Sequence, residues 1–335
     1  MKIDYKKKII SLTCLLFVLI LTIYFSYIKY GIWSVGIYAG QSPLSIKPGY
    51  NGTNNPVVSA NDVIDIESTG VADPFLLNVL EKYYLFFEII TKDKKVGAIG
   101  LATSVDGISW VYEKKVLEEK FHLSYPYTFV DSGKYYMIPE SNAANGVRLY
   151  SAVEFPLNWK FEKEIIKGSY SDSSLCYHDG KYWIFTFNTK DKSLYLFHSD
   201  SLMGNWVSHP ANPIISNNLN TARPGGRVFK MGNTIVRFAQ DDEPDYGNSV
   251  RAFTVNRMTV SEYQESELAE SPILTGTGSG WNRDGMHHVD VIQLNNSLWI
   301  AAVDGKKYIN VFDPIRRYEK IKSWIKHSLH QLFKQ

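Results

Sequence analysis

The chain has 335 residues, of which 14% are aromatic, and its formal net charge is only +2. So small a charge gives no support for a nucleic-acid partner, which usually requires a clustered basic face. No disulfide framework is expected, because Cys14 lies in an apolar N-terminal run and Cys176 stands alone in the rest of the chain. No complete set of metal ligands is visible, so we expect neither a metal site nor a cofactor.

The first thirty residues predict a membrane anchor. Four lysines precede an apolar run over residues 9–28, and about 20 such residues span a bilayer core as a helix. Because lysine-rich flanks stay in the cytoplasm, we expect a single-pass protein whose remaining residues lie in a periplasm, at a cell surface or in a lumen. The alternative is a cleaved signal peptide, although no small-x-small cleavage site follows the run.

Beyond the anchor, a two-strand unit recurs with a period of about 50 residues. Each copy has a short apolar strand, a turn with Gly or Asn and a strongly aromatic strand, most clearly at residues 129–138 and 175–185. Further copies lie around Phe75, Arg227 and Val289. Asp-Gly and Gly-Asn between apolar runs favour hairpin turns, because these residues tolerate positive φ.

A further strand and a tryptophan follow each of the first three hairpins, at Trp110, Trp159 and Trp206. Four strands per unit is the pattern of a propeller blade, so five copies predict an all-β, five-bladed β-propeller over residues 31–313. An irregular β-sandwich is the alternative. It does not explain why polar clusters recur at the same point of each unit.

These polar clusters stand at the start of the strand that we predict to be innermost in each unit. Because the innermost strands of a propeller surround its central channel, we expect the clusters to converge in one concave pocket. The clusters are residues 72–74, 124–126, 171–174, 222–227 and 287–290.

Six irregular motifs carry a resemblance to a known family. They are residues 71–75, 123–126, 139–141, 222–227, 239–241 and 287–290. With these motifs, residues 31–312 resemble the N-terminal domain of plant glucosamine inositolphosphorylceramide transferases and its stand-alone bacterial relatives. That domain is similar to the five-bladed propellers of glycoside hydrolase families 43 and 32 and of levansucrases. The resemblance implies a propeller with a sugar-handling pocket. It does not imply transferase activity, which the plant enzymes carry in a separate C-terminal domain.

The resemblance also implies catalytic positions. Inverting propeller glycosidases place a base Asp on the first blade, a pKa-tuning Asp on the second and an acid Glu on the third. Asp73 matches the first position, and Asp172 stands at the third. The second position falls near Tyr125, which has no carboxylate, and Glu140 could supply the missing group. Because glycoside hydrolysis needs two carboxylates flanking the scissile bond, we predict Asp73 as general base and Asp172 or Glu140 as general acid.

The other polar residues of the clusters predict substrate binding. Two arginines flank Gly225 and Gly226, and an arginine fork suits the carboxylate of an acidic sugar or the phosphate of a phosphorylated one. The alternative for these arginines is an internal salt bridge between blades. The predicted substrate-binding residues are Tyr125, Arg223, Arg227, Asp241, His287, His288 and Asp290.

After the propeller, residues 314–335 predict a basic amphipathic helix, because apolar residues recur at helical spacing with lysines between them. We expect this helix either to lie on the membrane surface or to pack against the propeller.

The whole sequence thus predicts a membrane-anchored, glycosidase-like enzyme that acts on a glycan, a glycolipid or a surface polysaccharide. One alternative is a non-catalytic glycan-binding module that assists a glycosyltransferase partner, which the missing second-blade carboxylate favours. Another is a glycosyltransferase or a phosphorylase on the same scaffold, with the arginines holding phosphate.

Overall fold

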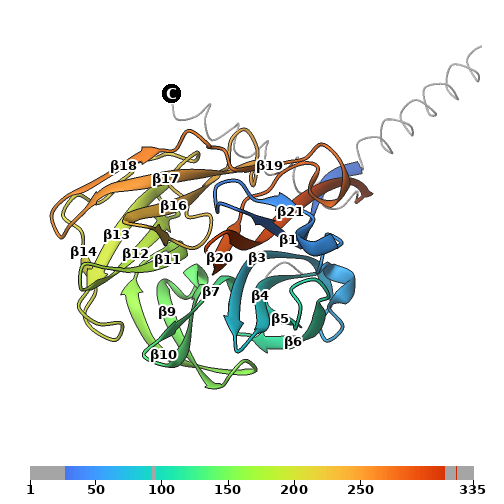
Figure 1. Ribbon diagram of the computed structural model, residues 1–335, viewed down its shortest axis with the longest axis horizontal. Helices are drawn as coiled ribbons and strands as arrows, with labels where there is room; N and C mark the ends of the chain where they lie inside the picture. The colour runs from blue at the N-terminus through green and yellow to red at the C-terminus, as the bar shows by residue number, and fades with distance from the viewer. Residues whose placement is uncertain (1–26, 93–95, 314–321, 323–335) are drawn as a thin grey trace, which may run out of the picture. The chain divides into compact units, whose positions relative to one another are not determined.

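Five sheets stand around one axis in the structure, a computed structural model that describes residues 27–92, 96–313 and 322 (Figure 1). Each sheet is one blade, so the described residues form an all-β, five-bladed propeller and the prediction from the repeat is confirmed. Short 3-10 helices lie in the connections, namely η1 (Tyr50–Gly52), η2 (Ala60–Asp62), η3 (Asn142–Ala144) and η4 (Gly280–Asn282).

The first three blades each take four consecutive strands in chain order, starting from the axis. Blade 1 consists of β3 (Ser68–Val79), β4 (Lys82–Thr91), β5 (Ala98–Ser104) and β6 (Val111–Leu117). Blade 2 consists of β7 (Ser124–Asp131), β8 (Lys134–Glu140), β9 (Gly146–Glu154) and β10 (Asn158–Lys167). Blade 3 consists of β11 (Tyr170–His178), β12 (Lys181–Asn188), β13 (Ser193–Ser199) and β14 (Val207–Ser208).

The last two blades depart from this simple order. Blade 4 consists of β15 (Phe229–Met231), β16 (Thr234–Asp241), β17 (Ser249–Met258) and β18 (Tyr263–Glu267), with β19 (Leu274–Thr275) also paired to β17. Blade 5 consists, in spatial order, of β20 (Val289–Asn295), β21 (Leu298–Phe312), β1 (Tyr27–Gly40) and β2 (Lys47–Pro48). Blade 5 therefore combines strands from both ends of the chain and closes the ring.

Residues 33–307 form one compact unit, and the described residues 27–32 and 308–313 belong to a second. Within the second unit, Tyr27 packs edge-on against Phe312, with ring centroids 5.5 Å apart. None of the helices among the described residues has the length and apolar character to cross a membrane. The predicted anchor, residues 9–28, lies outside the described residues up to position 26, and its last two positions belong to strand β1. The predicted C-terminal helix also lies outside them, except for Lys322.

The blades are buried on both faces because each packs between two neighbours. In β4, Leu85, Phe86 and Phe87 follow one another and all are fully buried. Leu85 and Phe87 share a core with Ile300 of blade 5, whereas Phe86 packs with Met137 of blade 2. Since side chains alternate along a strand, one apolar run serves two cores. This double burial explains why the aromatic second strand of each repeat stands out in the sequence.

The innermost strands of blades 1 to 3 share one local distortion. Each has a break in register near its start, and the residue at the break has positive φ: 52° at Asp73, 44° at Tyr125 and 52° at Asp172. Such a bulge re-aims the side chain that it carries. Aspartate tolerates this left-handed conformation, whereas a bulky tyrosine rarely adopts it. The bulge therefore marks the equivalent site position in three blades.

Candidate active site

Two sets of equivalent positions build the site at the start of the innermost strands. The first set is the bulge residues Asp73, Tyr125 and Asp172. The second lies on the neighbouring strand, where Glu88 pairs with Ala72, and Glu140 pairs with Ser124. The equivalent position on the second strand is Phe187 in blade 3, Gln240 in blade 4 and Asp304 in blade 5. Acidic or amide groups from four blades thus face the axis on one level.

Tyr125 closes the channel beneath these groups. Its ring is fully buried and packs edge-on against Phe75 and His288, with centroids 4.9 and 5.1 Å away. The Tyr125 hydroxyl lies 2.8 Å from Ser174 Oγ and accepts a hydrogen bond of 2.7 Å from the Gly226 N–H. Burial lowers the pKa of His288 to about 3, so this ring is neutral. Both residues were predicted to bind substrate, and the structure places them in the floor below the pocket.

Gly226 shows how tightly the floor is packed. Its φ is 142°, and a Cβ atom at this position would lie 1.7 Å from the carbonyl oxygen of Val289. Only glycine allows the two backbones to approach this closely. The second glycine of the predicted Gly-Gly motif therefore joins blades 4 and 5 rather than approaching a ligand.

The Arg227–Asp290 pair lies inside the propeller. Arg227 Nε and Nη2 bind the two carboxylate oxygens of Asp290 at 2.7 and 3.1 Å, and Nη2 also donates to the Thr128 carbonyl. Asp290 in turn accepts a hydrogen bond from the Leu76 N–H and is fully buried. This is the internal salt bridge that the sequence left as the alternative. It links four blades and leaves neither side chain on the pocket lining.

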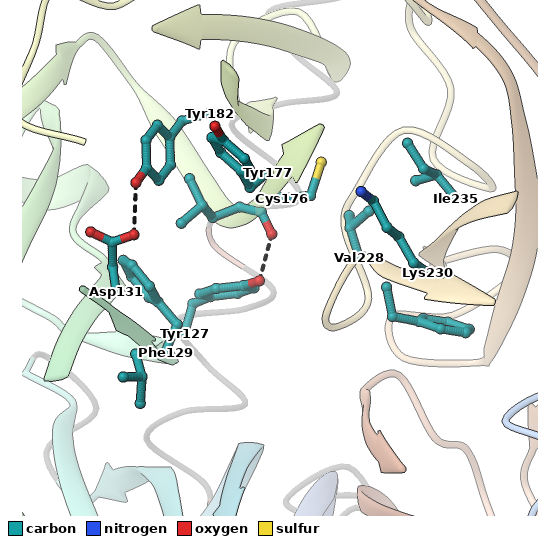
Figure 2. A pocket seen from close by; sticks show the side chains of 12 residues that line it. Tyr127, Phe129, Asp131, Cys176, Tyr177, Tyr182, Val228, Lys230 and Ile235 are labelled. Carbon is teal, nitrogen blue, oxygen red and sulfur yellow. Dashed lines mark hydrogen bonds between the residues drawn. The ribbon is translucent and has the colours of Figure 1, made fainter. Parts of the chain in front are cut away.

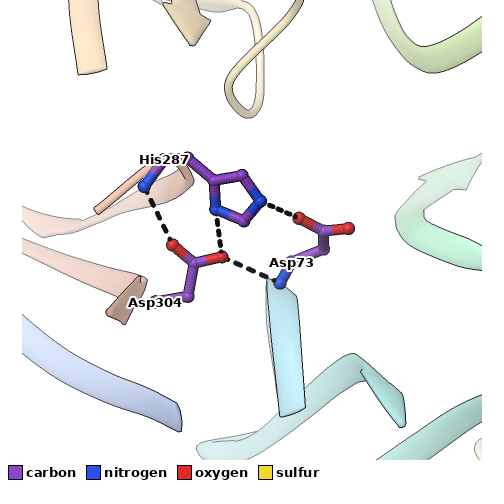
Figure 3. Close-up of side chains that lie close together, drawn as sticks. All are labelled: Asp73, His287 and Asp304. Atoms are coloured by element: carbon purple, nitrogen blue, oxygen red, sulfur yellow. Dashed lines mark hydrogen bonds and ion pairs between the residues drawn. The ribbon is translucent and has the colours of Figure 1, made fainter. Parts of the chain in front are cut away.

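A chain of three titratable groups crosses one side of the site (Figure 3). His287 Nδ1 lies 2.7 Å from Asp304 Oδ2, and His287 Nε2 lies 3.5 Å from Asp73 Oδ1. Although burial opposes it, the negative charges of Asp304 and Asp73 raise the pKa of His287. Burial acts to raise the pKa of Asp304, but the neighbouring His287 outweighs this effect and lowers it. An ionised Asp304 thus holds a protonated or proton-sharing imidazole against Asp73.

The same three residues are close enough to be tested as metal ligands. Asp304 and Asp73 lie at opposite nitrogens of the His287 ring, and one ion cannot lie in line with both nitrogens. The Asp304 oxygens also accept backbone hydrogen bonds of 3.1 Å from Asp73, His287 and His288. The arrangement therefore suits proton sharing better than metal binding.

The carboxyl groups of the site hold protons close to neutral pH. Burial, with Asp172 and Asp304 nearby, raises the pKa of Asp73 to about 7 despite His287. Burial and the charge of Asp73 raise the pKa of Glu88 well above its usual range. Burial and Asp172 raise the pKa of Glu140 to about 7, although it accepts hydrogen bonds. Buried like charges that disfavour one another are typical of acid–base sites.

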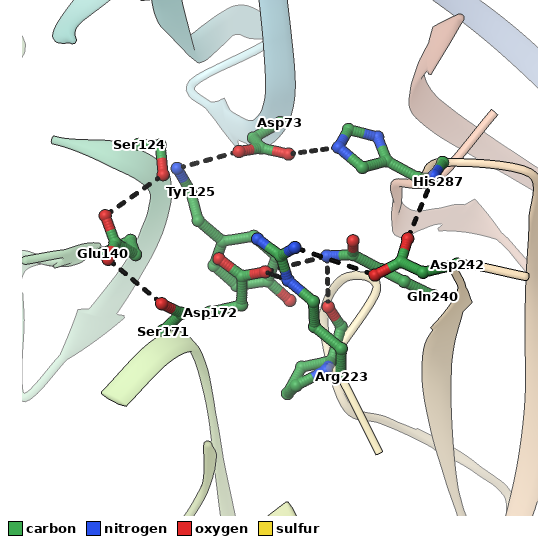
Figure 4. A network of polar contacts seen from close by, with 12 residues as sticks. Asp73, Ser124, Tyr125, Glu140, Ser171, Asp172, Arg223, Gln240, Asp242 and His287 are labelled. Carbon is green, nitrogen blue, oxygen red and sulfur yellow. Dashed lines mark hydrogen bonds and ion pairs between the residues drawn. The ribbon is translucent and has the colours of Figure 1, made fainter. Parts of the chain in front are cut away.

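Asp172 is held differently from the other carboxylates (Figure 4). Its Oδ2 accepts hydrogen bonds of 2.5 Å from Arg223 Nε and 2.8 Å from Gln240 Nε2. A second nitrogen of Arg223 lies 3.7 Å from Asp242. Asp172 therefore acts as the counter-ion of Arg223, and the Arg223 charge is already neutralised by two carboxylates.

The site opens into a pocket of about 220 Å³. Asp73, Glu88, Arg223 and His287 supply its charged groups. The remaining lining residues are Trp33, Ala72, Ile90, His122, Ser124 and Tyr246. Glu140 is set back from this lining and accepts hydrogen bonds of 3.0 Å from the Asn142 N–H and 3.2 Å from Ser171 Oγ. Asp241, which was predicted to bind substrate, instead pairs with Arg251 and Asn220 and does not line the pocket.

A second pocket of about 270 Å³ lies at the other ends of the innermost strands (Figure 2). Its lining combines aromatic and aliphatic side chains, and three of its polar side chains are engaged in hydrogen bonds within the fold. Tyr182 Oη donates to Asp131 at 2.7 Å, and Tyr127 Oη donates to the Leu175 carbonyl. Burial raises the pKa of Cys176 to about 12, so its thiol is unreactive. The buried carboxyls with raised pKa values line the acidic pocket instead.

Sequence reasoning missed Glu88, Asp304, Trp33 and Tyr246. Glu88 interrupts an apolar aromatic strand, and an acid within such a run was the available signal. Asp304 occupies the same position on the second strand of the last blade as Glu140 does on the second strand of blade 2. Aligning the second strands of the units would have revealed this position. Trp33 and Tyr246 have no signal, because they reach the pocket from β1 and from the loop after β16.

The Glu140 carboxyl should cost folding stability at neutral and alkaline pH. Its pKa is about 7 in the folded chain against an ordinary 4.5, so between these values the folded state keeps a proton that the unfolded state has lost. Stability then falls as the pH rises through this window. Glu140→Gln should therefore gain up to about 3 kcal/mol at about pH 8, and little at about pH 4.5.

Urea unfolding of the full-length chain at both pH values measures this difference. Glu154→Gln is the matched control, because Glu154 is exposed and its carboxylate accepts a hydrogen bond from the neighbouring Asn158. Equal gains in the two variants, or a larger gain at the acidic pH, would contradict the predicted linkage.

The described residues thus define a five-bladed propeller with a buried, acidic pocket at its axis. Residues 28–306 match the family model described as glucosamine inositolphosphorylceramide transferase 1, N-terminal. The chain belongs to this family, which confirms the resemblance seen in the sequence.

Two plant relatives show how much of the longer proteins is shared. Glucosamine inositolphosphorylceramide transferase 1 of Arabidopsis thaliana is 36% identical over 299 residues, which are 83% of this chain and 39% of the relative. The protein of the same name from Oryza sativa subsp. japonica is 35% identical, over 83% of this chain and 40% of the relative. The chain therefore spans about two fifths of the length of these relatives.

Solved structures share the fold at low sequence identity. β-1,2-Mannobiose phosphorylase from Listeria innocua superposes with a TM-score of 0.59 at 14% identity, covering 81% of this chain and 96% of that one. An α-L-arabinofuranosidase from Podospora anserina gives a TM-score of 0.57 at 11% identity, over 76% of this chain and 95% of that one. A thermostable family-43 glycoside hydrolase gives a TM-score of 0.55 at 16% identity, over 79% of this chain and 95% of that one.

Proposed function

We propose that the chain cleaves a glycosidic bond, with Asp73 as general base and Glu88 as general acid. The observation that carries the proposal is that these two buried carboxyls line the same small pocket. Each has a raised pKa, and the charge of Asp73 contributes to the rise at Glu88. Two carboxyl groups that share a site, one of them held protonated, are what hydrolysis of a glycoside requires.

The proposed reaction uses the groups as follows. Asp73 takes a proton from a water molecule, whose oxygen attacks the anomeric carbon. Glu88 gives its proton to the glycosidic oxygen as the bond to that carbon breaks. His287, held by Asp304, stabilises the charge on Asp73 and is a positioning residue. The products are the free sugar and the alcohol. Asp73 then releases its proton to solvent and Glu88 takes one up, so that both carboxyls return to their starting states.

Glu88 replaces the two acids that the sequence predicted. Asp172 has one carboxylate oxygen engaged by Arg223 and Gln240, and it does not line the pocket. Glu140 is set back from the pocket lining and contributes negative charge to Glu88. A phosphorylase activity in which the arginines bind phosphate is disfavoured, because Arg223 and Arg227 are both paired with carboxylates.

The pocket volume indicates the size of the substrate. Pockets for drug-sized ligands run from roughly 300 to 1,000 Å³, and this one is about 220 Å³. It therefore suits a single terminal sugar. The name of the plant relatives points to lipid-linked sugars, so we propose a glycolipid or surface glycan as substrate. We also propose that the anchor at residues 9–28 holds the pocket outside the cytoplasm, which protease accessibility on intact cells tests.

The activity test uses the full-length chain with a panel of glycolipids and synthetic glycosides, and it measures released sugar by mass spectrometry. Asp73→Asn should reduce release about 10²- to 10⁴-fold, the usual effect of losing a general base. Asp200→Asn is the control, because Asp200 is exposed and pairs with Lys181 at the surface, away from the pocket. Unchanged release in Asp73→Asn would remove Asp73 from the mechanism.

The second candidate is a non-catalytic sugar-binding module that assists a glycosyltransferase partner. It is favoured by Tyr125, which fills the equivalent position of blade 2 where a third carboxylate would stand. The two candidates give different results in the same panel. The binding-module hypothesis is supported if a glycan binds tightly but is never cleaved, and if it binds the Asp73→Asn variant equally well.

A further inference from the structure

A histidine lies beside the carboxyl that we propose as general acid. His122 belongs to the connection between β6 and β7, and it lines the acidic pocket together with Glu88. Its Nε2 atom lies 3.5 Å from Glu88 Oε1. The His122 side chain is 36% exposed and the Glu88 side chain 11%. The buried carboxyl of Glu88 therefore has a partly exposed imidazole as its neighbour.

The fold determines which nitrogen of His122 carries the proton. The backbone N–H of Gly97, just before β5, donates a hydrogen bond of 2.9 Å to His122 Nδ1. Because a backbone N–H can only donate, Nδ1 is an unprotonated acceptor. Burial lowers the pKa of His122, so the ring is neutral at neutral pH. A neutral imidazole carries one proton, which is therefore on Nε2 and faces Glu88.

The contact between Gly97 and His122 requires glycine. A Cβ atom on Gly97 would lie 2.5 Å from the Leu123 carbonyl oxygen and 2.7 Å from His122 Cε1. The Leu123 N–H donates in turn to the Gly97 carbonyl at 3.1 Å. Only glycine allows the two connections of blade 1 to approach this closely. The His122 ring is thus held at Nδ1 by backbone groups, and its orientation towards Glu88 is fixed before a substrate binds.

These contacts exclude one role for His122 and favour another. A histidine that relays a proton takes it up at one nitrogen and releases it from the other. His122 does not relay in this way, because the Gly97 N–H already occupies Nδ1. Its Nε2–H is free to donate to Glu88, and a hydrogen bond to a carboxylate is stronger than one to a neutral acid. The contact therefore strengthens as Glu88 gives up its proton, which is the change that lowers a reaction barrier.

We propose that His122 is a positioning residue, which donates its Nε2–H to Glu88 Oε1 and leaves Oε2 to carry the proton that is transferred. His122 keeps its own proton throughout. The inference rests on the proposed function in taking Glu88 as the general acid. The other titratable groups around Glu88 are the carboxyls of Asp73, Glu140, Asp172 and Asp304, the cations Arg223 and His287, and the phenol of Tyr246. Those carboxyls disfavour the ionised form of Glu88, whereas the His122 donor favours it.

The first test measures the pKa of Glu88 and does not depend on activity. The full-length chain is labelled with ¹³C at its glutamate carboxyls, and the Glu88 signal is identified by its absence in Glu88→Gln. His122→Phe keeps a flat ring without the donor and should raise the pKa of Glu88 by about one pH unit, since a hydrogen bond to a charged group is lost. His122→Gln keeps an N–H donor and should recover part of this change.

The control is His178→Phe, because His178 ends strand β11 and lies away from the acidic pocket. It should leave the pKa of Glu88 unchanged. ¹⁵N spectra of the unmodified chain, labelled at histidine, should show the His122 proton on Nε2. An unchanged or lower pKa of Glu88 in His122→Phe overturns the inference, and so does a proton on Nδ1 in the unmodified chain.

The second test uses the cleavage of alkyl glycosides. His122→Phe should lower kcat about 10- to 100-fold with little change in KM, because the misplaced acid meets the transition state poorly. Activity that needs protonated Glu88 is lost as the pH rises through its pKa, so the alkaline limb of the pH profile should move to higher pH. Glycosides of acidic phenols should be nearly unaffected, since their leaving groups need no proton.

Two kinetic results would overturn the inference. An equal loss for both substrate types would make His122 a structural residue, and a rise in KM alone would make it a substrate-binding one. If the unmodified chain cleaves no glycoside, the proposed function fails. The pKa of Glu88 and the position of the His122 proton then still decide whether His122 controls this carboxyl.

Discussion

Replacing Arg227 with alanine should lower the free energy of unfolding by about 3–5 kcal/mol, because it leaves a buried carboxylate without its partner. Asp290 is fully buried, and the Arg227 fork supplies two of its hydrogen bonds. Alanine also frees the Thr128 carbonyl that Arg227 holds across the channel. Urea unfolding of the full-length chain measures the loss.

Two further variants show whether the pair acts through charge or through packing. Arg257→Ala removes a surface pair with Glu262 and should change stability little. The double variant Arg227→Met, Asp290→Leu should recover most of the stability, since an apolar pair of similar volume often replaces a buried ion pair without loss. A loss in Arg227→Ala no greater than that in Arg257→Ala would mean that the internal pair does not hold the blades together.

Glu88→Gln should slow the cleavage of alkyl glycosides about 10²- to 10⁴-fold, because glutamine cannot protonate a poor leaving group. The same variant should cleave glycosides of acidic phenols at close to the rate of the unmodified chain, since these leaving groups depart without a proton. Comparing kcat/KM for the two substrate types measures this difference. It distinguishes a general acid from a residue that only shapes the pocket.

Glu140→Gln is the informative comparison for this experiment. Glu140 is buried at the same level but is absent from the pocket lining, so its loss should affect both substrate types to a similar, smaller extent. If Glu140→Gln instead shows the leaving-group dependence and Glu88→Gln does not, the general acid is Glu140, one of the two acids that the sequence predicted.

The architecture could be predicted because its signals are local. A hairpin such as residues 129–138 has its own turn residues and its own aromatic strand. The repetition of this pattern indicates blades without any knowledge of long-range contacts. The outer strands of blade 5 could not be predicted in this way. β1 pairs with β21 from the opposite end of the chain, and no local sequence pattern indicates that pairing.

The site could be located from the sequence but not fully assigned. The clusters containing Asp73, Asp172 and His287 do converge, as the propeller geometry requires. The roles of the arginines were open, because an arginine close to a pair of glycines looks the same in sequence whether it binds a ligand or a buried aspartate. The distances from Arg227 to Asp290 and from Arg223 to Asp172 decide the matter in favour of internal pairs.

The sequence by itself determined the five blades, the strand starts that face the axis and the family. It could do so because turns, strand periodicity and motifs are properties of neighbouring residues. Only the tertiary structure decided which polar groups share the pocket. Glu88 joins Asp73 there and Asp304 holds His287 from behind, whereas Tyr125, His288 and Arg227 close the channel below. Burial, pKa and pairing depend on residues brought together from different blades, and no stretch of the chain contains that information.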